Sequence, residues 1–394
     1  MEFTYYYIYS NFDFTQTSAG ATRMIYYAKA LADINHKVFL VSCCSTKIDN
    51  ECFKEMEPNI FVLEKKKLTK NFFKTIFFLK ELSSFSNSHS GKKVYIYYPY
   101  PLVSLEILAL IFFKYIKRKP VYYELNEIPK YTSSFHAPGS FRALKYSIKR
   151  IVFKTVFTVM EPFLIFYDGL ICISTAMVNY GKRYNKNILR IPILTDPYKN
   201  IKKSSNLYAK ENLTNIGFSG SIHPTKENLD SFINIITDLR KKGYKLSFNL
   251  CGTIFENYRN DFVEICRLRD EINYYGNLNP KEFSTFLSQQ DILVIPRGFS
   301  LQNKYGFSTK LSDYLNHKKI ILLTDISDNK LYIKDGFNGF IVPPDNELEM
   351  SNKLIYIYEN LSVLNKHIIP NAIESSKNYF YFKNYKKELQ NFVK

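Results

Sequence analysis

The stretch Phe218-Ser-Gly-Ser-Ile-His-Pro-Thr-Lys-Glu-Asn228 follows a short apolar run and precedes a segment with helical periodicity. It predicts a strand at 215–219, a glycine turn and then the start of a helix. Such a turn gathers backbone N–H groups and the positive end of the helix dipole at one point, which suits a phosphate. Lys226 would add a full charge there, although a plain turn with a solvated lysine fits the same residues.

The same alternation of strands and helices continues on both sides of this stretch. In the second half, strands are predicted at 246–251, 272–275, 292–295 and 320–323, and helices at 227–242, 280–289 and 309–316. In the first half, strands are predicted at 5–9, 38–42, 94–98, 121–124, 169–174 and 188–191, with helices at 23–35, from 102 and from 175. This rhythm predicts parallel sheets with crossover helices, and hence an α/β protein.

The length of 394 residues predicts two domains with separate cores. Pro192, Pro197 and the polar stretch 199–206 interrupt the pattern, so we expect a first domain at 1–195 and a second at 196–375. We expect residues 376–394 to form a helix, centred on 381–393, that packs back on the first domain. Two doubly wound domains of this kind would place a ligand cleft where the carboxyl ends of their strands face each other.

The formal net charge of +18 favours an anionic partner: nucleic acid, an anionic membrane or a phosphorylated small molecule. No helix-turn-helix, RNP-type strand or zinc finger is visible, so we expect no nucleic acid. The six cysteines form no CxxC pair, which argues against disulfides and structural zinc. The first residues do not resemble a signal peptide, so we expect a cytoplasmic protein.

Two basic, aromatic stretches indicate an anionic membrane surface as a partner. In 65–82, Phe72, Phe73, Ile76, Phe77 and Leu79 alternate with lysines, and 142–154 repeats the pattern. Such helices are typical of a membrane interface, although core-packing helices with solvated lysines have the same composition. The most apolar stretches, 102–116 and 151–173, carry charges that argue against a spanning helix.

A second segment with candidate binding residues runs from Ile295 to Leu315. Arg297 follows a predicted strand, and Gly306-Phe307-Ser308 leads into a helix whose N-cap is Ser308 or Thr309. Lys310 then lies in the first turn, where the dipole disfavours a cation unless an anion binds nearby. Asp313, on the same face, could accept hydrogen bonds from ribose or sugar hydroxyls, or it could simply be a first-turn acid that the dipole favours.

Five segments in this order resemble the donor domain of retaining glycosyltransferases of the GT-B fold, in group 1 or family 4. They are Gly220 to Lys226, Tyr275-Gly-Asn-Leu278 with the helix after Pro280, Asp291 to Pro296, Gly306 to Leu315, and Asp335 to Asp345. The first half resembles the same family more loosely, at Thr17 to Arg23, Asn35 to Val41, Glu124 to Glu127 and Asp168 to Ser174.

The resemblance implies two Rossmann-like domains facing across a central cleft, and metal-independent transfer of a sugar from a nucleotide-diphosphate sugar with no other cofactor. It implies catalytic roles for Lys226, Lys310 and Asp313. It implies donor contacts from Gly220, Ser221, Asn277, Arg297, Tyr305, Gly306, Phe307, Ser308 and Thr309, and acceptor-side roles for Gly20, Asn126 and Glu127. Tyr305 stands where the family has the first of two acids, and Ser221 stands where an arginine is common.

We therefore expect a retaining glycosyltransferase, peripheral on the inner face of the cell membrane. Its acceptor would be lipid-linked or a polysaccharide, as in capsule, O-antigen or exopolysaccharide synthesis. Two alternatives stay open. One is a nucleotide-sugar epimerase, for which only His136 and His223 lie near candidate loops. The other is an inactive subunit of a membrane-bound complex, which the substitutions at Tyr305 and Ser221 favour.

Overall fold

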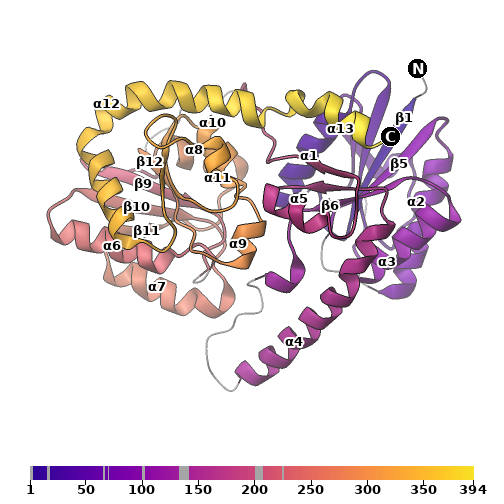
Figure 1. Cartoon of the computed structure of the whole chain (residues 1–394), viewed down its shortest axis with the longest axis horizontal. Coiled ribbons are helices and arrows are strands. Elements are labelled where there is room, and N and C mark those ends of the chain that lie inside the picture. The colour runs from indigo at the N-terminus through magenta and orange to yellow at the C-terminus, as the bar shows by residue number, and fades with distance from the viewer. Residues whose placement is uncertain are drawn as a thin grey trace. The chain divides into compact units, whose positions relative to one another are not determined.

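The computed structural model describes residues 3–15, 18–64, 67–69, 71–99, 103–132, 142–199, 207–223 and 226–394. For 142–150 it describes the helix without its side chains. The chain forms two compact units, each with its own β-sheet (Figure 1). The first comprises Met1–Asn126, Thr158–Leu194 and Phe382–Lys394, and the second comprises Glu127–Phe157 and Thr195–Tyr381.

The first unit has a sheet of eight strands in the order β3-β4-β2-β1-β5-β6-β7-β8. Only the pairing of β3 with β4 is antiparallel among the pairs of this sheet that the structure describes. The strands are β1 (Thr4–Ser10), β2 (His36–Ser42), β3 (Phe53–Glu57), β4 (Ile60–Leu63), β5 (Lys92–Tyr97), β6 (Val121–Leu125), β7 (Gly169–Cys172) and β8 (Ile188–Arg190). The central strands are buried on both faces, which explains their nearly continuous apolar sequence.

Helices cover both faces of this sheet. Packed on one face are α1 (Ala19–Leu31) and the C-terminal α13 (Lys386–Phe392). The other face contacts α2 (Phe72–Asn87) and α3 (Val103–Leu110), which continues as a π-helix over Ile111–Ile116. The return of the C-terminus to the first unit, predicted from the sequence, is confirmed: the Gln390 amide donates to the Leu31 carbonyl oxygen at 2.9 Å. Two further helices are α4 (Arg142–Met160) and α5 (Thr175–Gly181).

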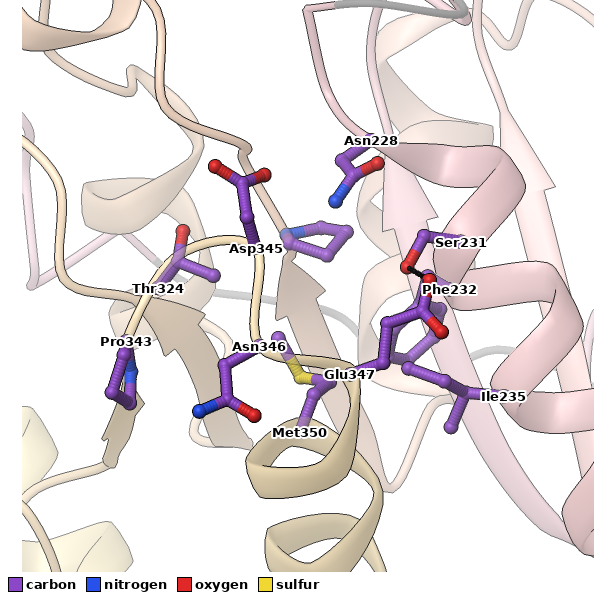
Figure 2. A pocket seen from close by; sticks show the side chains of 11 residues that line it. Asn228, Ser231, Phe232, Ile235, Thr324, Pro343, Asp345, Asn346, Glu347 and Met350 are labelled. Carbon is purple, nitrogen blue, oxygen red and sulfur yellow. Dashed lines mark hydrogen bonds between the residues drawn. The ribbon is translucent and has the colours of Figure 1, made fainter.

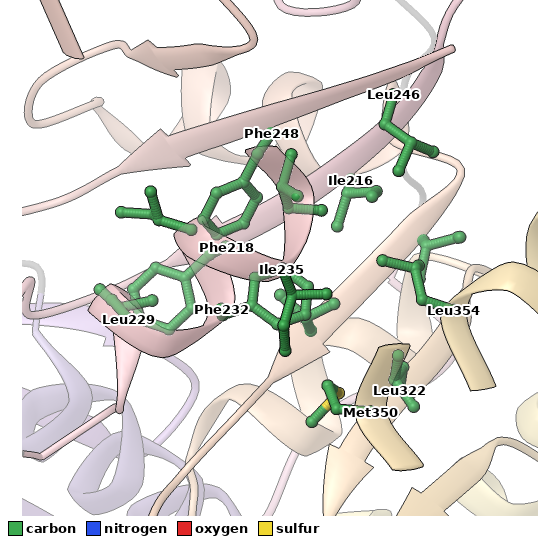
Figure 3. Close-up of a cluster of buried hydrophobic side chains, with 14 of the residues drawn as sticks. Ile216, Phe218, Leu229, Phe232, Ile235, Leu246, Phe248, Leu322, Met350 and Leu354 are labelled. Carbon is green, nitrogen blue, oxygen red and sulfur yellow. The ribbon is translucent and has the colours of Figure 1, made fainter. Parts of the chain in front are cut away.

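The second unit has a parallel sheet of six strands in the order β11-β10-β9-β12-β13-β14. The strands are β9 (Thr214–Ser219), β10 (Leu246–Cys251), β11 (Ile272–Tyr274), β12 (Ile292–Ile295), β13 (Ile320–Thr324) and β14 (Phe340–Val342). The helices are α6 (Leu229–Lys241), α7 (Arg259–Leu268), α8 (Pro280–Ser288), α9 (Leu301–Tyr305), α10 (Lys310–Asn316), α11 (Asn329–Tyr332) and α12 (Glu347–Phe380). Phe218 of β9, Phe232 of α6 and Leu354 of α12 meet in one buried core (Figure 3).

Three boundaries differ from the sequence prediction for local reasons. The helix predicted from Glu227 begins at Leu229, because Asn228 adopts a left-handed conformation with φ of 50°. The helix predicted from Arg23 begins at Ala19, where the Ser18 side chain accepts a hydrogen bond from the Ala21 N–H and caps it. The final helix predicted over 381–393 begins only at Lys386, because Tyr381 is extended and Phe382–Tyr385 form a 3-10 turn.

Among the described residues, no helix is both long enough and apolar enough to cross a membrane.

Candidate functional site

Glycines let three backbone loops meet at the carboxyl edge of the second sheet. Gly220 follows β9 with φ of 129°, and Gly252 follows β10 with φ of 127°. A Cβ on Gly252 would lie 2.0 Å from the Gly220 carbonyl oxygen. The Gly252 N–H donates to the carbonyl oxygen of Gly276, in the loop after β11, at 2.8 Å. Only glycine permits this approach, at the edge where open α/β sheets bind ligands.

A buried carboxylate, Glu227, joins the two segments that the sequence analysis singled out. Arg297 donates to it from Nε at 3.2 Å and from Nη2 at 3.0 Å. The Lys310 ammonium donates to the same carboxylate at 2.7 Å. Although burial alone would raise the pKa of Glu227, Arg297 and then Lys310 hold it well below the usual value. Glu227 is therefore a carboxylate between two cations.

Lys310 is the first residue of α10 and follows Thr309, one of the two predicted N-caps. Its side chain is 10% exposed and lies against Gly220, where an added Cβ would be 2.7 Å from the Lys310 Cε. Burial lowers the pKa of Lys310 to about 8, against the opposing attraction of Glu227. The anion that the sequence predicts beside this lysine is, in this structure, the Glu227 carboxylate.

The turn before α10 carries the other predicted donor residues. Phe307 is buried against Tyr332, with ring centres 5.3 Å apart. The buried Ser308 hydroxyl has no hydrogen-bond partner among the described residues. Tyr305 stacks on Tyr131, with ring centres 5.7 Å apart and ring planes 8° apart. Thus the residue in place of the family's first acid presents an aromatic ring.

Asp313 lies on α10, three residues after Lys310, and is partly buried. Burial raises the pKa of its carboxyl to about 6, and Lys199 opposes this shift. Within the described ranges, the carboxylate makes no hydrogen bond or ion pair. It is therefore an acceptor group left available at the same edge of the sheet.

Lys226 lies beside Lys310 but has a different partner. Its ammonium is 3.6 Å from a carboxylate oxygen of Glu127, which groups with the second unit. The cluster therefore has three cations, Lys226, Lys310 and Arg297, and two carboxylates. Its net charge is +1. The arrangement can attract an anion without first losing an ion pair.

The remaining predicted residues are placed as follows. The Asn277 side chain accepts a hydrogen bond from the Thr253 hydroxyl at 2.9 Å. Ser221 is exposed after Gly220. Gly20 lies on α1, where an added Cβ would be 2.6 Å from the Tyr98 hydroxyl oxygen. Asn126 follows β6 and is partly buried.

A small pocket lies at the same edge, where Thr324 ends β13 and Pro343 follows β14 (Figure 2). At its rim, the Ser231 hydroxyl donates to the Glu347 carboxylate at 2.7 Å, and the Phe299 N–H donates to Asp345 at 2.8 Å. None of the residues predicted for the site lines it. The lining residues are Asn228, Ser231, Phe232, Ile235, Pro296, Thr324, Pro343, Asp345, Asn346, Glu347 and Met350.

Two buried acids of the structure, Glu227 and Glu124, were not predicted from the sequence. Glu227 stood next to Lys226 but gave no sign that its partners are Arg297 and Lys310, far along the chain. In the first unit, Glu124 accepts from Arg23 Nε at 2.5 Å, and both side chains are buried. No group of three or more His, Cys, Asp and Glu side chains arranged to bind a metal occurs in the described part of the chain.

Comparisons with known proteins concern the family of the second unit and the fold of the chain. Residues 198–375 match the family described as "Glycosyl transferases group 1". A sucrose-phosphate synthase (tll1590) from Thermosynechococcus elongatus has a similar structure, with a TM-score of 0.69, 10% identity, and coverage of 99% of this chain and 98% of that one. A glycosyltransferase from Rickettsia africae ESF-5 gives a TM-score of 0.66 at 14% identity, covering 100% and 99%.

Anabaena Alr3699/HepE, solved in complex with UDP and glucose, gives a TM-score of 0.66 at 13% identity and covers 98% of each chain. Among curated proteins, none matches this sequence. The fold is GT-B, with two Rossmann-like sheets and a C-terminal helix that returns to the first unit. The match to the group 1 glycosyltransferases lies within the second unit, at residues 198–375.

Proposed function

We propose that the chain transfers a sugar, with retention, from a nucleotide-diphosphate sugar to a lipid-linked or polysaccharide acceptor. The observation that carries this proposal is the placement of Lys310. Its buried ammonium lies against Gly220, at the carboxyl edge of the sheet, inside the segment that matches the family. An ammonium held in a low-dielectric environment stabilises negative charge better than one in water.

The donor diphosphate would bind between the loop after β9 and the start of α10. Lys310, Lys226 and Arg297 would neutralise the charge that develops on the leaving diphosphate, so the mechanism needs neither a metal nor a protein nucleophile. The backbone from Gly306 to Thr309 and the Ser308 hydroxyl would supply further donors. Asp313 would accept from the ribose, and Asn277 and Ser221 would complete the donor contacts.

A thermal-shift screen tests donor binding directly, because a ligand that binds only the folded state raises the melting temperature. UDP is the first nucleotide to test, since it is present in the HepE structure, and GDP and ADP serve as comparisons. A rise with one nucleoside diphosphate supports the site. Unchanged melting temperatures at millimolar concentrations of all three would contradict it.

We place the acceptor and its pathway in bacterial surface-glycan assembly (capsule, O-antigen or exopolysaccharide), with the protein peripheral on the inner face of the membrane. Gly20, Asn126 and Glu127 would lie on the acceptor side. Release of labelled sugar into a lipid extract tests for a lipid-linked acceptor, and incorporation into polymer tests the alternative.

Membrane binding would use the two basic stretches, 65–82 and 142–154. On α2, Phe72, Phe73 and Phe77 are 49%, 77% and 40% exposed. Leu79, predicted to share that surface, is instead buried in the core. On α4, Ile151 and Val152 are 64% and 56% exposed. Lys65, Lys66 and Lys70 lie outside the described residues. Exposed aromatic rings beside lysines suit an anionic interface.

An inactive subunit remains the second candidate, favoured by the Tyr305 ring that replaces an acid. It predicts nucleotide binding without turnover. An epimerase has less support, because His223 is buried and packs on Phe255, with ring centres 4.5 Å apart. The predicted His136 lies outside the described residues. Assays of transfer and of donor epimerisation over a panel of nucleotide sugars distinguish the three functions.

A further inference from the structure

Hydrogen bonds anchor the backbone on both sides of the contact between Glu227 and Arg297. The Asn303 side chain donates to the carbonyl oxygen of Lys226, the preceding residue, at 2.8 Å. The Arg297 carbonyl oxygen accepts from the Thr324 hydroxyl at 2.7 Å, which fixes the arginine backbone. Because both partners are anchored, the contact between Glu227 and Arg297 is a defined feature of the fold.

The carboxylate is the group that makes two buried cations compatible. Arg297 and Lys310 are 9% and 10% exposed, and both donate to Glu227 Oε1. Without an anion, two desolvated cations this close would repel each other strongly. With Glu227 present, the three side chains carry a net charge of +1. The carboxylate then holds the Lys310 ammonium and the Arg297 guanidinium close to each other.

We propose that Glu227 is a positioning residue of the donor site, which holds the Lys310 ammonium beside Arg297 and balances its charge before the diphosphate arrives. This inference rests on the proposed function, because it takes Lys310 as a diphosphate contact. Glu227 itself touches neither phosphate nor sugar; it acts through Lys310 and Arg297.

The charged neighbours of Lys310 determine how its proton responds to the loss of Glu227. Burial lowers the pKa of Lys310 to about 8; Glu227 raises it, and Arg297 and Lys226 lower it. The Tyr314 hydroxyl, which interacts electrostatically with Glu227, is hydrogen-bonded to Ser219. Removing the Glu227 charge leaves only lowering effects. Lys310 would then lose its proton below pH 8 and with it the charge that holds a diphosphate.

The test is the pH dependence of UDP, GDP and ADP binding, measured by calorimetry on the full chain between pH 6 and 9. In the wild-type protein, affinity should fall as pH rises through about 8. In Glu227→Gln, this alkaline limb should move to lower pH by roughly 1 to 3 units, the usual effect of losing an opposite charge at this distance. An unmoved limb in a folded Glu227→Gln protein would overturn the proposal.

Two further variants test whether the titration of Lys310 causes the fall in nucleotide affinity at alkaline pH. In Glu227→Gln combined with Lys310→Arg, the limb should return to high pH, because a guanidinium does not titrate in this range. Glu264→Gln removes an exposed carboxylate paired with Arg267 in the same unit, and should leave the limb in place. A limb that moves equally in Glu264→Gln would contradict a local role for Glu227.

If Glu227→Gln does not fold, Glu227→Asp keeps the charge on a shorter side chain. Affinity for the diphosphate should then fall about tenfold while the limb stays near its wild-type pH; unchanged affinity would overturn the positioning role. Failure of the proposed function gives a different result. In that case Lys310→Ala would leave nucleoside diphosphate binding intact, or none of the three nucleotides would bind the wild-type protein.

Discussion

Gly220 leaves the space that the Lys310 side chain occupies, since a Cβ on Gly220 would lie 2.7 Å from Lys310 Cε. Gly220→Ala should therefore displace the ammonium and lower kcat at least tenfold. Gly243→Ala is the matched control: Gly243 also has positive φ, at 95°, but an added Cβ there meets nothing within 4 Å. Both variants carry the backbone strain of alanine at positive φ. Equal losses of activity in the two would show that strain alone, and not Lys310, is responsible.

The protonation of Asp313 should make donor affinity fall at acidic pH. Because burial raises the pKa of its carboxyl to about 6, the carboxylate that would accept ribose hydroxyls is protonated below that pH. Donor affinity should fall as pH drops through 6, and Asp313→Asn should lose about tenfold in affinity at pH 8 together with this fall at acidic pH. Its melting temperature at pH 8 should hold or rise, since a partly buried charge is removed. Unchanged affinity would assign Asp313 a structural role only.

Glu106 of α3 should make the first unit less stable at alkaline pH. Burial raises the pKa of its carboxyl from 4.5 to about 7 in the folded protein. Between these values the folded protein holds a proton that the unfolded chain has lost, so the free energy of unfolding falls as pH rises and stays low above 7. Glu106→Gln should raise the melting temperature at pH 8 by several degrees and change it little at pH 4.5. A gain of equal size at both values would contradict the assignment.

Membrane binding should depend on Phe73, which is 77% exposed on α2. The protein should co-sediment with anionic vesicles at low salt and be released at high salt. Phe73→Ser should weaken this binding about ten- to a hundredfold, because an inserted aromatic ring contributes about 1.5–3 kcal/mol. Ile34→Ser is a control at another exposed apolar residue, 85% exposed between α1 and β2. No sedimentation of the wild-type protein with anionic vesicles at low salt would rule the membrane proposal out.

Strand periodicity predicted the central strands well, because buried parallel strands have distinctive apolar runs. The hairpin of β3 and β4 was missed. Residues 54–57 of β3 are exposed and three of the four are charged, so no apolar run marks β3, and the apolar run of β4 is only four residues long. The helix α12 was missed as well. It continues through Pro370, and a proline ordinarily indicates the end of a helix.

Within the site, local rules located Lys310 but did not identify its partner. A lysine at the start of α10 opposes the helix dipole, so local rules alone predict that Lys310→Ala leaves the fold unchanged or slightly more stable. The contact with Glu227 reverses this expectation, since the variant leaves a buried carboxylate with Arg297 as its remaining cation. A pairing between residues 83 apart in sequence depends on the tertiary fold and has no local signature.

The central claim is that Lys310 binds the leaving diphosphate, and the turnover of Lys310→Ala with a panel of nucleotide sugars tests it most directly. Loss of one charge-assisted contact to the leaving group should cost roughly 3 kcal/mol, or about a hundredfold in kcat. Lys226→Ala should behave similarly, and the double variant should lose less than the two single losses combined. Circular dichroism would confirm that each variant is folded. Near-normal turnover of folded Lys310→Ala with the correct donor would contradict the account and place the diphosphate elsewhere.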